Sequence, residues 1–442
     1  MSLFMSSWIA LEPSPNIIPL ESVINLISMF LGRLVTRGRL HLILPDGRHE
    51  SFGPGGAEEV TVRLRDNRVA LDIARDPKLA FGEAYMDGRL TIEQGDISQL
   101  LAIALGNNRW EDGGGGRAAL GRARPGLRSL LTPLLKPLLR RNPPARSKQN
   151  VTHHYDLSDQ LYELFLDRDW QYSCAYFVDP ANDLERAQND KKAHIAAKLC
   201  LRPKQRVLDI GCGWGGTALY LNRVADVDVL GVTLSEGQLK VARRRAADAG
   251  VADRVKFDLI DYRSLTGTFD RIVSIGMFEH VGSAHYDEFF ATCRELLAPD
   301  GVMLLHTIGR LGAAAVNPDP FITKFIFPGY HLPSLSQLLE ASQKSRLIVA
   351  DVETLRLHYA YTLRHWVTRT QASKAEIVAL YDDRFYRMWE FYLAGAVMLF
   401  ETGSGCNYQV QFIRDRYALP ITRDYLQQEE KRFADLSSQK LR

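Results

Sequence analysis

Several patterns are missing from the 442-residue sequence, and each absence argues against a class of protein. The cysteines are Cys174, Cys200, Cys212, Cys293 and Cys406. Because none of them is spaced as C-x-x-C, they indicate neither a metal site nor a disulfide framework, and we expect a reducing cytoplasm. The start lacks the basic region of a signal peptide. Charged residues interrupt the apolar stretch 17–35, which predicts an amphipathic helix instead of a membrane span.

Acidic residues are absent from residues 113–155. The basic residues of this stretch are Arg117, Arg122, Arg124, Arg128, Lys136, Arg140, Arg141, Arg146 and Lys148. Glycines at 113–116 and prolines at 143–144 are typical of a linker, and leucines alternate with basic residues at 127–139. An anionic membrane surface would suit this composition, and so would a solvated linker whose leucines pack on a neighbour. Nucleic acid is disfavoured because no recognised binding motif accompanies the charge.

The linker predicts three parts: an amino-terminal domain at 1–108, a basic linker at 109–150 and a catalytic domain at 151–442. Short strand-like runs at 40–44 and 60–64 indicate that the first part is a small α+β domain.

The third part alternates between two periodicities. Helical patterns cover 185–199 and 217–223, and strand patterns cover 207–210, 227–232, 255–259, 270–275 and 302–306. Such alternation predicts an α/β fold with a Rossmann-like, doubly wound parallel sheet. Ligands of such sheets bind beyond the carboxyl ends of the strands, where the strand order reverses.

A glycine turn follows the apolar strand at 207–210. Its glycines Gly211, Gly213 and Gly215 flank Cys212 and let the backbone turn tightly beside a ligand. The spacing is G-x-G-x-G, whereas dinucleotide folds use G-x-G-x-x-G, and no G-x-x-x-x-G-K-[ST] phosphate loop occurs in the sequence. The turn therefore indicates S-adenosylmethionine (SAM), and not NAD or ATP.

The next two strands end in further polar residues. Thr233, Ser235 and Gln238 follow the second strand, where many nucleotide-binding folds place an acidic residue on the ribose, and Ser235 could also cap the next helix. Asp261 and Tyr262 follow the third strand. We expect them to meet the adenine, the aspartate accepting from the amino group and the tyrosine packing on the ring.

Five spaced motifs resemble the cyclopropane-fatty-acyl-phospholipid synthase family, which is related to the mycolic acid cyclopropane synthases. They are Tyr155-Asp-Leu-Ser158, Tyr172-Ser-Cys-Ala-Tyr176, the glycine turn, Gly276-Met-Phe-Glu-His-Val-Gly282 and His306-Thr-Ile-Gly309. The stretch Phe81-Gly-Glu-Ala-Tyr-Met-Asp-Gly88 extends the resemblance to the amino-terminal part. The resemblance implies a class I SAM-dependent methyltransferase with an amino-terminal lipid-binding domain.

It also implies a reaction, in which the methyl group of SAM goes to the cis double bond of an unsaturated phospholipid acyl chain. A bound bicarbonate then removes a proton, and a cyclopropane ring closes. The residues that the resemblance places on bicarbonate are Cys174, Glu279, His306, Ile308 and Tyr359. Glu279 could also accept a hydrogen bond from His306. Tyr172 and Ser173 would contact the methionine part of SAM.

Other interpretations stay open. A related enzyme could form a methylene or methyl branch from the same carbocation, and a homologue could bind lipid without catalysis. Cys174 could be a buried small residue, and the aromatic helix at 385–400, like Phe177, could be core or could line an acyl channel. The resemblance further implies a homodimer bound peripherally to the inner face of the cytoplasmic membrane. Gly237, which replaces a common glutamate, and the long linker depart from the family pattern.

Overall fold

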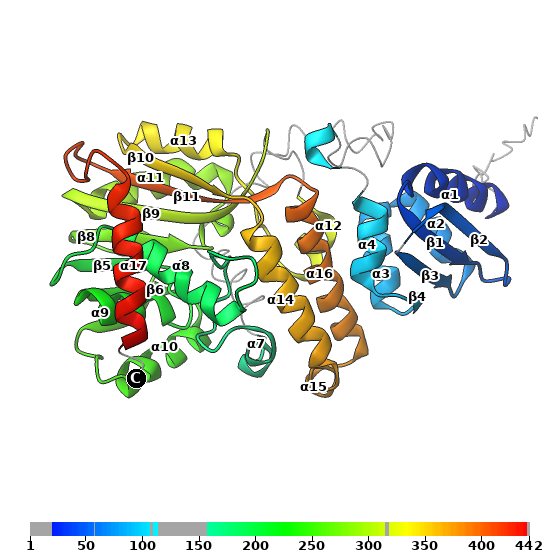
Figure 1. The fold of residues 1–442 in the computed structure, drawn as a ribbon, viewed down its shortest axis with the longest axis horizontal. Helices are drawn as coiled ribbons and strands as arrows, with labels where there is room; N and C mark the ends of the chain where they lie inside the picture. The colour runs from blue at the N-terminus through cyan, green and yellow to red at the C-terminus, as the bar shows by residue number, and fades with distance from the viewer. Residues whose placement is uncertain (1–19, 57, 107–108, 114–156, 314–317, 440–442) are drawn as a thin grey trace, which may run out of the picture.

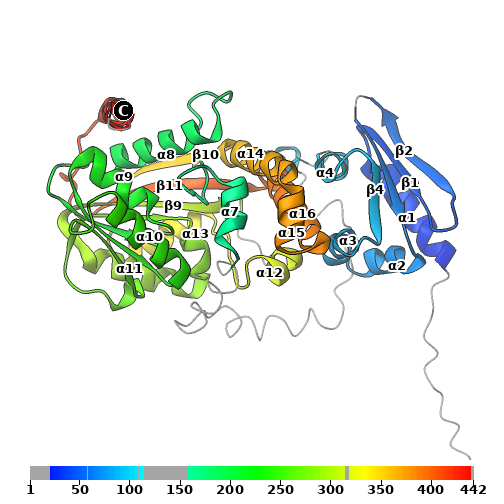
Figure 2. The same ribbon diagram turned by 90° about the horizontal axis from the view of Figure 1, so that it is seen from below.

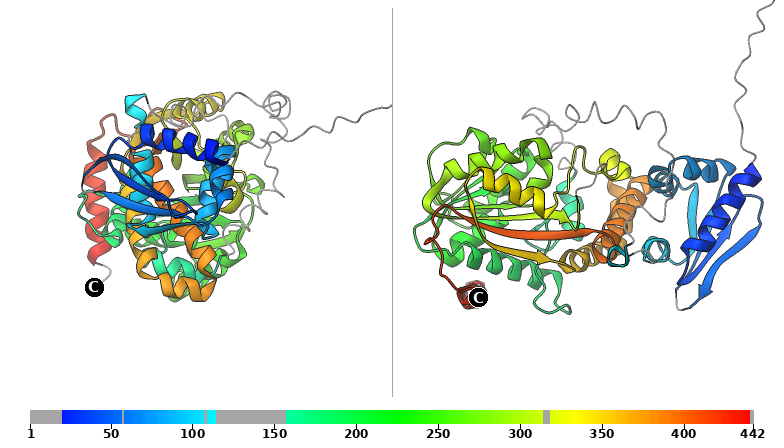
Figure 3. Two further views of the ribbon diagram at one scale, coloured as in Figure 1. Left: turned by 90° about the vertical axis from the view of Figure 1, so that its right-hand side faces the viewer. Right: turned by 90° about the horizontal axis from the view of Figure 1, so that it is seen from above.

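The computed structural model describes residues 20–56, 58–106, 109–113, 157–313 and 318–439, which form two sheets at opposite ends of the molecule (Figure 1). The elements of the amino-terminal end are α1 (Leu20–Leu34), β1 (Gly38–Ile43), β2 (His49–Gly55), β3 (Glu59–Leu64), α2 (Asn67–Arg75), α3 (Pro77–Met86), β4 (Leu90–Gln94) and α4 (Ile97–Leu105). The predicted strand-like runs are β1 and β3, which pair in parallel within a four-stranded sheet of order β2-β1-β3-β4. Figure 3 shows α1 lying across one face of this sheet.

The larger sheet has seven strands in the order β10-β11-β9-β8-β5-β6-β7. The strands are β5 (Arg206–Ile210), β6 (Asp228–Thr233), β7 (Val255–Leu259), β8 (Phe269–Ile275), β9 (Leu297–Arg310), β10 (Ile348–Leu355) and β11 (Gly405–Ile413). Strand β5 pairs in parallel with both β6 and β8, so the strand order reverses at β5. Strand β11 is antiparallel to both of its neighbours, β9 and β10. The doubly wound, Rossmann-like sheet predicted from the sequence is confirmed, with β11 as an antiparallel addition.

Helices lie on both faces of the larger sheet, and α12, α14, α15 and α16 lie between the two sheets (Figure 2). The helices are α7 (Asp159–Phe165), α8 (Leu184–Lys198), α9 (Gly216–Ala225), α10 (Glu236–Asp248), α11 (Tyr286–Leu296), α12 (Pro320–Phe325), α13 (Leu335–Lys344), α14 (His358–Ala372), α15 (Lys374–Leu380), α16 (Asp383–Glu401) and α17 (Asp424–Gln439). Short 3-10 turns include η1 (Trp110–Asp112), η2 (Tyr262–Ser264), η3 (Phe278–His280) and η4 (Ser283–His285). One core cluster joins α8, α9, α10 and α17 to the sheet, and a second joins α11 and α13 to the opposite face.

The two ends of the molecule meet at α16, against which α3 and α4 pack (Figure 1). Tyr85 of α3 donates its hydroxyl to Oε2 of Glu390 at 2.7 Å, and Arg387 Nε donates to the carbonyl of Met86 at 2.7 Å. A Cβ at Gly82 would lie 2.5 Å from the ring of Phe321, so only glycine permits this close packing. The Phe81–Gly88 motif therefore contributes Gly82, Tyr85 and Met86 to the contact between the two ends.

Several elements depart from the prediction. Strand β9 continues past residue 306 to Arg310, because β11 pairs with it up to Arg310, whereas the parallel neighbour β8 stops beside His306. Strands β2, β4, β10 and β11 and helix α17 were not predicted from the sequence.

Two expectations fall on residues that the structure does not cover. Most of the basic linker, along with Tyr155 and Asp156, lies outside the described residues, so the boundaries at 108 and 150 stay predictions.

Helix α1 coincides with the predicted amphipathic helix over residues 20–34. Among the described helices, none combines the length and apolar character that a membrane crossing requires.

Candidate active site

A cavity opens at the carboxyl ends of β5, β6 and β8, beside the point where the strand order reverses. The residues that sequence reasoning assigned to the cofactor and that line it are Tyr172, Ser173, Gly211, Cys212, Gly213, Thr233, Gln238, Asp261 and Tyr262. Ser235 is not among the lining residues, because it begins α10 and its hydroxyl accepts a hydrogen bond from Gln238 N at 3.3 Å. The fold thus brings together residues that lie up to 90 positions apart, from Tyr172 to Tyr262.

The glycine turn shapes one wall of the cavity. Gly211 and Gly213 have φ angles of +81° and +54°, which favour glycine, and a Cβ at Gly213 would meet no atom within 4 Å. Gly215 differs, because its Cβ would lie 2.6 Å from the ring of Phe257 and would disturb packing within the core. Gly213 therefore combines a left-handed backbone with open space at this wall, whereas core packing explains Gly215.

Polar side chains on the opposite wall are already oriented. Thr233 donates to Oε1 of Gln238 at 3.0 Å, and its hydroxyl accepts from Ser235 N at 3.2 Å. Burial raises the pKa of Asp261, but hydrogen bonds from Arg263, one of them 2.6 Å long, lower it below the usual range overall. Asp261 therefore stays an ionised acceptor at neutral pH.

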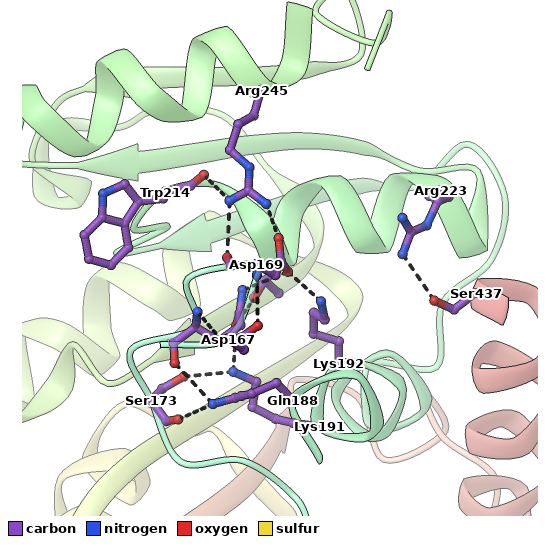
Figure 4. A network of polar contacts seen from close by, with 12 residues as sticks. Asp167, Asp169, Ser173, Gln188, Lys191, Lys192, Trp214, Arg223, Arg245 and Ser437 are labelled. Carbon is purple, nitrogen blue, oxygen red and sulfur yellow. Dashed lines mark hydrogen bonds and ion pairs between the residues drawn. The ribbon is translucent and has the colours of Figure 1, made fainter. Parts of the chain in front are cut away.

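Residues 170–173 form a third wall, and the segment 167–173 that contains them is held by a dense polar network (Figure 4). Asp167 Oδ1 accepts from Gln171 N at 2.8 Å, and Asp169 bridges Lys192 of α8 and Arg245 of α10. The ion pairs hold the pKa of Asp169 at about 2 although burial raises it. The segment is therefore fixed to two helices before any ligand binds.

Sequence reasoning missed Asp209, which lines the cavity from the end of β5. Its side chain is buried, its Oδ2 has no hydrogen-bond partner among the described residues, and burial raises its pKa to about 7. A carboxylate without a partner in an apolar strand is costly, so an aspartate inside the run Val207–Ile210 was the available signal. Gln171 and His280 also line the cavity and were not singled out.

None of the five residues that the resemblance places on bicarbonate is among the lining residues, but three of them are next to lining residues in the chain or the sheet. Cys174 follows Ser173 in the chain, Glu279 precedes His280, and His306 is paired with Ile275 across β8 and β9. Ile308 lies two residues further along β9, and Tyr359 lies in the first turn of α14.

Glu279 and Ile308 are in direct contact, because Glu279 Oε1 accepts a hydrogen bond from Ile308 N. Glu279 is buried, and its Oε2 has no hydrogen-bond partner among the described residues. Burial raises the pKa of this carboxyl, and hydrogen bonds lower it by a smaller amount, so that the pKa is about 7. One carboxyl oxygen is thus positioned by backbone, and the other is available for a donor.

His306 does not make the expected hydrogen bond with Glu279. Its Nδ1 lies 3.1 Å from Gln409 Nε2, and its Nε2 lies 3.4 Å from Asn407 Nδ2. Both amides belong to β11, which pairs with β9 and presents these side chains on the same face as the imidazole. Burial lowers the pKa of His306 to about 3, so the ring is neutral at physiological pH.

Cys174 and Tyr359 are buried in the aromatic core beside the site. The Cys174 thiol lies 3.3 Å from the carbonyl of Ala175, and burial raises its pKa above the usual thiol range. The ring of Tyr359 packs edge-on against Trp366, with centroids 5.8 Å apart. The neutral thiol and the aromatic ring give this side of the site an apolar character.

The aromatic helix predicted at 385–400 is α16, and most of its aromatic rings are core. Tyr386, Trp389 and Tyr392 are buried, whereas Phe385 and Phe391 pack against the core from its margin. Tyr392 also reaches the cavity wall, because its hydroxyl lies 3.1 Å from that of Tyr172.

Comparisons with known proteins identify the family of the chain. A family model described as mycolic acid cyclopropane synthetase matches residues 143–410, and one for a domain of unknown function matches residues 27–110. A probable fatty acid methyltransferase from Pseudomonas putida is 35% identical, covering 87% of this chain and 95% of the relative. A cyclopropane-fatty-acyl-phospholipid synthase from Escherichia coli is 37% identical, covering 81% and 89%.

A solved structure is also similar. The mycolic acid cyclopropane synthase CmaA1, crystallised with SAH and CTAB, superimposes with a TM-score of 0.57 at 37% identity, covering 60% of this chain and 97% of the other.

Proposed function

The chain belongs to the mycolic acid cyclopropane synthetase family and is a SAM-dependent methyltransferase, and on this basis we propose that it forms cyclopropane rings in phospholipid acyl chains. The observation that carries the proposal is the buried Glu279 carboxylate beside the SAM cavity, with one oxygen lacking a partner among the described residues. The name of the Escherichia coli relative supports a phospholipid substrate.

The cavity fits SAM, since Asp209 offers a buried oxygen without a described partner and Gly213 leaves room for a ligand. We assign Asp261 and Tyr262 to the adenine, Thr233 and Gln238 to the ribose, and the segment around Tyr172 and Ser173 to the methionine end. Ser235 contributes through the cap of α10, which orients Gln238. When bound, SAM supplies an electrophilic methyl group.

The lipid double bond is a weak nucleophile, and its attack on the methyl carbon breaks the carbon–sulfur bond and leaves a carbocation on the acyl chain. A base must then take a proton from the new methyl group, and the electron pair of that carbon–hydrogen bond closes the ring. Water would trap the cation, so the buried aromatic surroundings of Cys174 and Tyr359 serve the reaction by excluding it.

We assign bicarbonate as the base, held beside Glu279. Glu279 Oε2 can accept the hydroxyl proton of bicarbonate, and Ile308 N holds the other carboxyl oxygen in place. His306 fits less directly, because the side-chain amides of Asn407 and Gln409 already face both of its ring nitrogens. These two amides would have to rearrange before the imidazole could contact the ion.

The amino-terminal part and the basic linker are proposed to hold the enzyme on the cytoplasmic face of the membrane, as a homodimer. The support is the run of basic residues and leucines in the linker. Binding to vesicles containing phosphatidylglycerol should fall as salt rises, and sedimentation should give twice the chain mass. Salt-insensitive binding would contradict the linker's role.

The reaction is tested by mass spectrometry of membrane lipids from a bacterium without such enzymes. The strains express the wild-type chain, Glu279→Gln or the control Glu340→Gln, which changes an exposed carboxylate on α13. Wild type and control should add one methylene to unsaturated chains, and fragmentation should identify a ring. Glu279→Gln should lose at least about 100-fold in product, the usual scale for a positioned acid–base group.

Other outcomes decide between the alternatives. A methylene or methyl branch would assign the related branching methyltransferase. Unchanged lipids despite folded protein that binds SAH would contradict the lipid substrate.

A further inference from the structure

Two buried polar side chains on one face of α8 have no part in the chemistry above. Gln188 and Lys191 are both fully buried, one turn apart. Burying an ammonium group is costly unless it is well bonded, so a lysine at this depth requires an explanation.

Both side chains hold the cavity wall at the same two residues. Lys191 Nζ donates to Oε1 of Gln171 at 2.6 Å and to Oγ of Ser173 at 2.9 Å. Gln188 Nε2 donates to the carbonyls of Gln171 and Ser173, at 3.1 and 3.0 Å. The segment is thereby bound through backbone and side chain together, as Figure 4 shows.

Gln171 and Ser173 themselves line the SAM cavity. Thr217 of α9 also donates to Gln171 Oε1, at 3.3 Å, so this amide oxygen joins α8 and α9 behind the cavity. Asp209 lines the same cavity, and the Lys191 ammonium partly offsets the rise that burial causes in the pKa of its carboxyl. A ligand that carries both an ammonium and a carboxylate, as the methionine end of SAM does, would meet a surface whose donors and acceptors are already fixed.

We propose that Lys191 and Gln188 are positioning residues for the methionine end of SAM, acting through Gln171 and Ser173. The inference rests on the proposed SAM site and deepens it. Burial lowers the pKa of Lys191 to about 7, partly offset by Asp167, which agrees with a lysine kept for position and not for surface charge. Neither residue touches the reacting atoms, so both should govern cofactor affinity more than turnover.

Lys198 offers a matched control. It lies two turns further along α8, is equally buried, and pairs with Glu353 and Asp351 away from the cavity wall. Replacing either lysine by methionine keeps most of the side-chain volume and removes one buried ammonium. If any substitution in α8 weakens SAH binding, both variants should show the loss. If the loss comes from the cavity wall, only Lys191→Met should show it.

The test is calorimetric binding of SAH to the full-length chain, together with steady-state kinetics against SAM. Lys191→Met should weaken SAH binding by about tenfold or more, the effect of losing a charged hydrogen bond. Its KM for SAM should rise while kcat at saturating SAM stays within about threefold of wild type. Lys198→Met, with native circular dichroism, should bind SAH within about twofold of wild type.

Two further variants keep the inference open to refutation. Ser173→Ala combined with Lys191→Met should weaken binding by less than the product of the single effects, because the two residues share one hydrogen bond. If Lys191→Met does not fold, Gln188→Met takes its place with the same expected direction.

Unchanged SAH affinity in folded Lys191→Met or Gln188→Met would overturn the inference, as would an equal loss in Lys198→Met. SAH binding does not involve lipid. A wild-type chain that binds SAH and forms no lipid product would therefore contradict the proposed function and leave this inference standing.

Discussion

Asp209 lies near the end of β5 and Glu279 lies in η3, which follows the neighbouring strand β8. Both carboxyl groups are buried, and each has one oxygen without a partner among the described residues. Burial raises both pKa values to about 7. Such groups cost stability when ionised, so their presence beside a cavity indicates function more strongly than a surface carboxylate would. The same property makes the stability of the protein depend on pH.

Glu279→Gln should flatten the pH dependence of the free energy of unfolding. In the folded state Glu279 releases its proton near pH 7, whereas in the unfolded chain it does so near pH 4.5. The contribution of this group to the free energy of unfolding is therefore fully present below about pH 4.5 and is lost as pH rises through 7. The loss amounts to about 3 kcal/mol. Urea unfolding of both proteins across this range measures it, with Glu340→Gln as the exposed control. Parallel curves for wild type and Glu279→Gln would contradict the buried carboxyl.

At the scale of single elements, α8 connects the carboxy-terminal helix to the sheet. His194 lies between two carboxylates, 2.8 Å from Glu353 of β10 and 3.1 Å from Glu430 of α17. Burial lowers the pKa of His194, but hydrogen bonds with these carboxylates outweigh it and raise the pKa above the usual range. Lys198 shares Glu353, and the ring of Tyr176 stacks on the imidazole. The His194 side chain thus links α8 to α17 and to β10.

His194→Gln should destabilise the protein more at about pH 6 than at about pH 9. A histidine whose folded pKa is raised stabilises fully below its unfolded pKa, near 6.5, and that contribution is lost as pH rises through the folded pKa. We expect a difference of about 1 to 2 kcal/mol between the two pH values. Urea unfolding measures it, and His285→Gln, at an exposed pair with Glu288, serves as control. A pH-independent loss would show that His194 acts by packing alone.

At the scale of the whole molecule, α16 connects the two ends. Glu390 is buried and receives hydrogen bonds from Tyr85 at 2.7 Å, Gln371 at 3.1 Å and Tyr386 at 3.2 Å. Two residues along the same helix, Tyr392 contacts the cavity wall. The amino-terminal end is therefore attached to a helix that also borders the site.

Tyr85→Phe should weaken the attachment of the amino-terminal end. The variant keeps the ring but leaves Glu390 Oε2 buried without its donor, at a cost of about 1 to 3 kcal/mol. Limited proteolysis should release the amino-terminal part faster, and thermal unfolding should begin at lower temperature. The control is Tyr417→Phe, whose ring is 86% exposed. Equal proteolysis of Tyr85→Phe and wild type would indicate that apolar packing around Gly82 suffices.

Local patterns in the sequence were enough to predict the parallel strands β5 to β9. Most residues of β5 and β9 are buried, so these strands read as nearly continuous apolar runs, whereas Val255 and Phe257 of β7 alternate with exposed residues. Local patterns were not enough for β10 and β11. β11 is fully buried, yet Asn407, Gln409 and Gln411 interrupt its apolar pattern, because they face polar groups of β9 and α8.

The sequence by itself determined the parallel strands, the glycine turn and nine of the residues that line the cavity, because each of these depends on residues close together in the chain. Only the tertiary structure decided which groups share a hydrogen bond. His306 meets Asn407 and Gln409 although about 100 residues separate them, and Lys191 reaches Ser173 from a different element. Burial likewise set the pKa values of Glu279 and Asp209, since desolvation depends on neighbours that no local pattern specifies.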